Sequence, residues 1–138
     1  MKYRHALLLT AALVSILSLA QCATTRPAAP AARIARVWRG EVPAARADEY
    51  EKYLTAEGIG KLRAIPGNLG VQMFRRAAGD RAEFVVISYW PTEESIRGWA
   101  GENVTSVRLL PRDREFLIDP EMQVRHYTIA VDERGASR

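Results

Sequence analysis

The sequence predicts an α+β domain built on one four-stranded antiparallel sheet, with its helices on a single face. Two observations support this prediction. Four segments rich in β-branched and aromatic residues alternate with two stretches of helical spacing. The middle two of these segments are joined by AAGD, a connection short enough to require an antiparallel hairpin.

The first half of the domain is predicted to be a strand followed by a helix. IARVWRGEV (34–42) is rich in β-formers and is ended by Pro43. Residues 44–58 have helical spacing, and Gly58 and Gly60 are expected to interrupt this helix before a short apolar turn that closes at PG. The inner face of the helix carries four apolar or aromatic side chains: Ala47, Tyr50, Tyr53 and Leu54.

The second half supplies three strands and one helix. NLGVQMFRR (68–76) and RAEFVVISYW (81–90) form the hairpin, and Thr92 can cap a helix whose inner face carries Trp99. An irregular stretch with one helical turn near 113–117 precedes the last strand, MQVRHYTIAV. The order β-α-β-β-α-β is the ferredoxin-like arrangement.

The third strand is apolar on both faces at its centre, FVVISYW. Such a strand is covered on both sides, and the helices account for only one of them. A second copy of the sheet is therefore expected to cover the open face, which predicts a homodimer.

The N-terminus differs from the rest of the chain. A short basic start precedes the apolar run Ala6–Ala20, which has the features of a secretory signal (1–21) and is short for a membrane span. LSLAQC ends at Cys22, the only cysteine, and resembles a bacterial lipobox in which the cysteine is lipidated, although Gln21 is atypical. Ordinary cleavage after Ala20, which leaves a free thiol, is the alternative.

Lipidation implies a membrane-anchored protein, and by resemblance to sorting signals Ala23 favours the outer membrane facing the periplasm. The alternative is a soluble periplasmic or secreted protein. The Ala- and Pro-rich segment 22–33 is expected to be a tether, 34–131 the folded domain and 132–138 a polar tail.

Charge and motifs exclude several functions. Of 20 basic residues two lie in the leader, so 18 oppose 16 acidic residues, and the arginines are scattered rather than arranged as a nucleic-acid-binding stripe. Apart from His5 in the leader the chain has one histidine, and no phosphate-binding loop or nucleophile elbow. We therefore expect no metal, no nucleotide cofactor and no nucleic-acid partner.

Four segments together resemble the antibiotic biosynthesis monooxygenase-like family of dimeric α+β-barrel proteins: ARVWRGEVPAARADEYEKYL, AIPGNLGVQMFRR, EFVVISYWPTEESIRGWAGEN and VRHYTIAV. The resemblance implies either oxygenation of aromatic phenols with O2 alone, or haem degradation, or an activity not yet defined. The haem-degrading branch implies an Asn on the first strand, a Trp on the second helix and a His after it. Only the Trp is present, as Trp99; Trp38 stands at the Asn position, and AGENVTSVRLLP has no His.

Arg36 and Trp38 share one face of the first strand and, with Trp99, are candidates for a pocket between helices and sheet. There Arg36 would hold an anionic oxygen, unless it lies at the strand end and reaches solvent. Tyr50 and Tyr53 are candidate substrate-binding residues, or packed rings. His126 is the candidate base, because its ordinary pKa is near neutral, or else it is buried in the core or dimer interface.

The leading hypothesis is therefore an envelope-anchored, cofactor-independent monooxygenase-like protein acting on a small planar phenol or quinol, with His126 and Arg36 as catalytic residues. The alternative from another class is a non-catalytic envelope lipoprotein that binds a ligand or partner with the same fold. Haem binding or degradation is the weaker third hypothesis.

Overall fold

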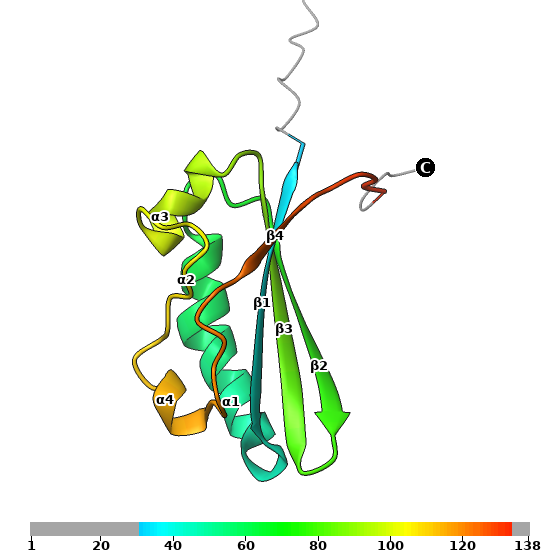
Figure 1. Cartoon of the computed structure of the whole chain (residues 1–138), viewed down its shortest axis with the longest axis vertical. Helices are drawn as coiled ribbons and strands as arrows, with labels where there is room; N and C mark the ends of the chain where they lie inside the picture. Colours follow the sequence, from blue (N-terminus) through cyan, green and yellow to red (C-terminus); the bar gives the residue numbers. More distant parts are fainter. Residues whose placement is uncertain (1–30, 134–138) are drawn as a thin grey trace, which may run out of the picture.

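The computed structural model describes residues 31–133, which form one antiparallel sheet and one helical layer (Figure 1). The strands are β1 (Ile34–Pro43), β2 (Val71–Ala78), β3 (Arg81–Trp90) and β4 (Arg125–Thr128). Their order in the sheet is β2-β3-β1-β4. The predicted fold class, α+β with ferredoxin-like order, is confirmed.

The helical layer lies entirely on one side of the sheet (Figure 1). Its first part runs continuously through η1 (Ala44–Arg46), α1 (Ala47–Tyr53), η2 (Leu54–Ile59) and α2 (Gly60–Arg63). Its second part consists of η3 (Glu94–Ile96) with α3 (Arg97–Ala100), followed after a loop by α4 (Asp113–Phe116). No helix formed by residues 31–133 lies on the opposite face of the sheet (Figure 1).

The first helical stretch differs from its prediction. Gly58 and Gly60 do not interrupt it: Gly58 lies within a wider π-type turn, η2, that joins α1 to α2, and Gly60, with helical φ and ψ of −58° and −47°, is the first residue of α2. A π-type turn inserts one extra residue without breaking the helix, and such turns occur often at functional sites.

Two strands are shorter than predicted. β2 begins at Val71 because Gly67 and Gly70 have positive φ values of 87° and 141°, which turn the chain just before it. β4 begins at Arg125 because the preceding residues pair with a loop instead of β1: the Val124 amide donates to the Thr105 carbonyl.

The core lies between the sheet and the helices. Register places Trp38 opposite Val86, Gly40 opposite Phe84 and Val42 opposite Ala82, and the face they share is turned toward the helices. Trp90 is fully buried there and donates from Nε1 to the Ser88 hydroxyl, so it is a packing residue. No helix within residues 31–133 is long and apolar enough to cross a membrane.

Candidate functional site

A cavity of about 50 Å³ lies between the helical layer and the sheet. By this measure it holds a few waters, since one water needs roughly 10–15 Å³. Its lining is mostly apolar and comes from β1, β3, the η2–α2 stretch, α3 and the loop leading into α4. Four lining residues are polar: Arg36, Ser88, Arg108 and Asp113.

Arg36 is brought to the cavity by the alternation of β1 and is only 4% exposed. Its Nη2 donates to the Ser106 carbonyl at 2.8 Å, and its Nε to the Val104 carbonyl at 3.5 Å. A guanidinium has five N–H groups, and among residues 31–133 Arg36 has no carboxylate partner. Burial lowers the pKa of Arg36 to about 10, so it remains cationic near neutral pH. An anionic ligand group would relieve this desolvated charge.

Two indoles line the same cavity, Trp38 from β1 and Trp99 from α3. The Trp38 ring lies over Gly40: a Cβ at that glycine would be 2.5 Å from the ring edge. Trp99 is 8% exposed, and the exposed Arg108 guanidinium lies over its ring at 4.8 Å from the centroid. Flat aromatic surfaces suit a planar apolar ligand.

Asp113 is the first residue of α4 and, among the residues that the structure describes, supplies the only carboxylate that lines this cavity. It is 3% exposed; its Oδ2 accepts from the Leu110 amide at 2.7 Å and its Oδ1 from the Tyr50 hydroxyl at 3.1 Å. Burial raises the pKa of Asp113 more than these two hydrogen bonds lower it.

Sequence reasoning missed Asp113 and Arg108 as site residues. Asp113 was expected only as part of a helical turn, and nothing in LLPRDREFL distinguishes it from neighbouring charges that face solvent. The positions of both residues at the cavity depend on how the segment after Trp99 folds back over the helices, and no local sequence pattern encodes this path.

Tyr50 and Tyr53 lie beside the cavity rather than in its lining. Tyr50 is fully buried, with its ring edge-on to Phe84 at 5.3 Å, and it reaches the cavity only through Asp113. Tyr53 stacks on Phe116, and its hydroxyl accepts from the Arg112 amide.

His126 pairs in register with Arg36 and therefore projects from the same face of the sheet, yet it does not line the cavity. Its Nδ1 lies 3.3 Å from the Glu93 carboxylate, and its buried Nε2 has no partner within the described residues. The structure thus brings Arg36, Trp38 and Trp99 together and leaves His126 beside them.

Cys22 lies outside the described residues. Within residues 31–133, no cluster of three His, Cys, Asp or Glu side chains could hold a metal ion.

Comparisons with known proteins support the fold. The family model for antibiotic biosynthesis monooxygenase matches residues 33–103. An antibiotic biosynthesis monooxygenase structure from Bacillus cereus, labelled putative, aligns with a TM-score of 0.52 at 14% identity, covering 75% of this chain and 98% of that one. A protein of unknown function from Nitrosomonas europaea gives a TM-score of 0.57 at 13% identity, covering 79% and 100%.

A haem-free structure of a haem-degrading protein from Mycobacterium tuberculosis aligns with a TM-score of 0.50 at 24% identity, covering 74% of this chain and 96% of that one. At these identities the structural matches establish the fold alone. A search among curated proteins gave no significant match.

Proposed function

Because this chain belongs to the antibiotic biosynthesis monooxygenase family, we propose that it is a cofactor-independent monooxygenase acting on a small planar phenol or quinol. The observation that carries the proposal is the cavity itself. Two indoles line a small apolar space that also contains Arg36, a buried guanidinium with no carboxylate partner among residues 31–133.

The chemistry needs no metal or flavin. A quinol that loses a hydroxyl proton becomes an electron-rich anion, and a ring carbon of that anion forms a C–O bond with O2. The resulting hydroperoxide then breaks its O–O bond and releases water, leaving a carbonyl. One oxygen atom enters the product and the other leaves as water, with all four electrons supplied by the substrate. Arg36 stabilises the anion as its charge develops.

Loss of Arg36 tests this role. The Arg36→Met chain should show O2-dependent quinol turnover about 10²-fold below wild type, the effect typical of removing one group that stabilises a developing negative charge. O2 uptake is measured with chlorohydroquinone, with protein-free and anaerobic samples as blanks. Arg63→Met, an exposed arginine on α2, is the matched control and should match wild type.

The proposal fails if the wild-type chain causes no O2-dependent loss of chlorohydroquinone or of unsubstituted hydroquinone. Because Arg36→Met leaves the Ser106 carbonyl without its donor, each variant is first checked for folding by circular dichroism.

A non-catalytic ligand-binding protein is the second candidate. It is favoured by the position of His126, which lies off the cavity and so offers no base there. Binding of a quinol under anaerobic conditions, with no O2 uptake when air is admitted, would support the non-catalytic ligand-binding function. Haem binding is the weaker candidate, since Trp38 occupies the expected Asn position and the cavity volume of about 50 Å³ suits a much smaller ligand.

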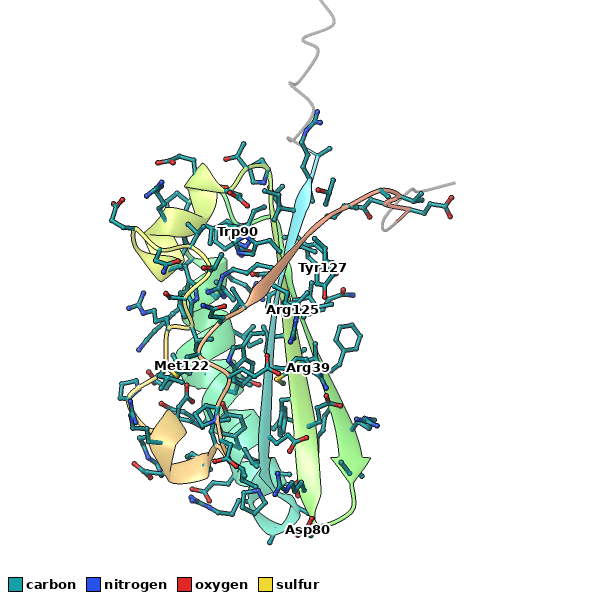
Figure 2. The ribbon with its side chains drawn as sticks, viewed as in Figure 1. Arg39, Asp80, Trp90, Met122, Arg125 and Tyr127 are labelled. Carbon is teal, nitrogen blue, oxygen red and sulfur yellow. The ribbon has the colours of Figure 1, made fainter. Side chains whose placement is uncertain are left out.

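A homodimer through the open sheet face is part of the proposal. That face carries exposed apolar side chains, among them Phe74 and Tyr127, which are 49% and 52% exposed. Figure 2 shows Tyr127 and Arg125 on this side, away from the helices. An apolar surface of this kind on a sheet is stabilised when a second sheet covers it.

We also propose that the protein is exported and anchored to the envelope through Cys22, on the basis of the apolar run and lipobox-like LSLAQC. A Cys22→Ser chain should leave the membrane fraction and become soluble. A variant that still fractionates with membranes would exclude the anchor.

A further inference from the structure

We propose that Asp113 is the proton acceptor of the cavity, an inference that rests on the monooxygenase function proposed above. The base suggested by sequence, His126, does not line the cavity. Asp113 does, together with Trp38, Trp99 and Arg36, and it lies on the opposite layer from Arg36. A substrate between them would face a carboxylate on one side and a guanidinium on the other.

The carboxylate is free to accept a proton. Each of its oxygens takes one hydrogen bond, from the Tyr50 hydroxyl and from the Leu110 amide, which leaves a second lone pair on each. Among residues 31–133 it forms no ion pair: Arg112 pairs with Glu115, and the cavity arginines Arg36 and Arg108 donate to backbone carbonyls. A buried carboxylate without a cation is more basic than an exposed one.

Tyr50 acts as a positioning residue. Its hydroxyl donates to Asp113 while its ring packs against Phe84 and Phe116, so the donor is held by the core. Burial and the neighbouring carboxylate raise the pKa of Tyr50 well above its ordinary value. It therefore stays a neutral donor and does not compete for the substrate proton.

Asp113 and Arg36 together define the substrate class. A carboxylate is a weak base toward an ordinary phenol, whose pKa is about 10. Transfer to Asp113 becomes feasible when the hydroxyl is acidified by an electron-withdrawing substituent and the resulting anion lies against Arg36. We therefore assign the cavity to acidified phenols and quinols, of which chlorohydroquinone is a small representative.

The test compares Asp113→Asn with wild type in the full chain. Asparagine keeps the shape and one oxygen but cannot take a proton. Anaerobic binding of chlorohydroquinone, followed by tryptophan fluorescence, should change by less than about threefold, whereas aerobic O2 uptake should fall about 10²- to 10⁴-fold. Asp80→Asn, an exposed residue in the β2–β3 hairpin at the far end of the molecule, is the matched control and should keep full turnover (Figure 2).

A second variant does not depend on how Asp113→Asn folds. Tyr50→Phe keeps the packed ring but removes a hydrogen bond that lowers the pKa of Asp113. Turnover should fall at low pH, where Asp113 is protonated. Because Tyr50→Phe raises the pKa of Asp113, this acidic limb of the pH–rate profile should move to higher pH in the variant. The other charged residues that line the cavity are Arg36 and Arg108, and Arg112 with its partner Glu115 flanks Asp113 on the same segment. Arg36 stays cationic across this range and Tyr50 stays neutral.

Unchanged turnover in a folded Asp113→Asn chain overturns the assignment of Asp113 as the proton acceptor but leaves the proposed function standing. The same holds if turnover is lost in His126→Asn instead. An acidic limb that does not move in Tyr50→Phe also overturns this assignment. Absence of O2 uptake by the wild-type chain overturns the proposed function, and the Asp113 inference with it.

Discussion

Charged side chains in this domain fall into two environments. The exposed arginines pair with carboxylates at the surface, as Arg97 does with Glu94 and Arg75 with Asp48. Arg36 and Asp113 are buried on opposite walls of one cavity and have no charged partner among residues 31–133. Keeping both groups desolvated and unpaired opposes folding, which is typical of residues retained for binding or chemistry.

Glu83 shows the opposite arrangement, on the open face of the sheet. Its side chain is 7% exposed and pairs with both Arg39 and Arg76. These hydrogen bonds hold the pKa of Glu83 below its ordinary value of 4.5. A lowered carboxylate pKa stabilises the fold above pH 4.5, and that contribution is lost as the pH falls through the lowered value.

Glu83→Gln should therefore lower the free energy of unfolding by about 1 kcal/mol at neutral pH, because both arginines lose their anion. The difference from wild type should vanish at low pH, where Glu83 is protonated and resembles glutamine. Urea unfolding at neutral and acidic pH measures this. Glu57→Gln, which removes the carboxylate of an exposed pair with Lys61, is the control and should have a smaller effect. A difference in unfolding free energy between wild type and Glu83→Gln that grows at acidic pH would contradict the stabilising role of ionised Glu83.

At the scale of elements, the π-type turn η2 shapes the cavity. The extra residue allows Leu54, Gly58 and Ile59 all to line the cavity. Gly58 is needed there because a Cβ would lie 2.9 Å from Leu54 Cδ1 and 3.1 Å from Leu110 Cδ1. The glycine therefore keeps the helix in close contact with the loop that precedes α4.

Gly58→Ala should weaken quinol binding by about tenfold or more, because its methyl group displaces two leucines that line a cavity of about 50 Å³. Gly60→Ala is the matched control: its Cβ has nothing nearer than 3.7 Å, so it should leave binding unchanged and stabilise the helix by up to about 1 kcal/mol. Anaerobic titration and thermal unfolding check both. Equal binding in the two variants would show that η2 does not shape the site.

At the scale of the whole molecule, the sheet separates two surfaces with different roles. The helix side, seen in Figure 1, encloses the cavity. The open side presents apolar side chains such as Phe74 and Tyr127 together with Glu83 and its two arginines. We expect two copies to associate through the open side, which leaves each cavity within its own protomer.

Phe74→Asp should convert the dimer to a monomer or weaken it at least tenfold, because the new carboxylate must be desolvated in an apolar interface. Light scattering after size-exclusion chromatography measures the mass. Met122→Asp is the control, since Met122 is 54% exposed but lies in the loop before β4, on the helix side in Figure 2. A Phe74→Asp chain with the same mass as wild type would exclude this face as the interface.

Much of the fold could be predicted because its signals are local. The alternation of IARVWRGEV placed Arg36 and Trp38 on one face, and the hairpin and element order set the sheet. The continuous helix through Gly58 and Gly60 could not be predicted, because tertiary packing outweighed the glycine propensity. The late start of β4 likewise depends on a competing partner, the loop at Thr105.

The sequence by itself determined the α+β class and the faces of β1, because strand and helix periodicities are properties of neighbouring residues. Only the tertiary structure decided which ionisable groups share the cavity. Whether a carboxylate is buried and unpaired depends on the path of the loop from Val104 to Asp113, which places Asp113 at the cavity and leaves His126 beside Glu93.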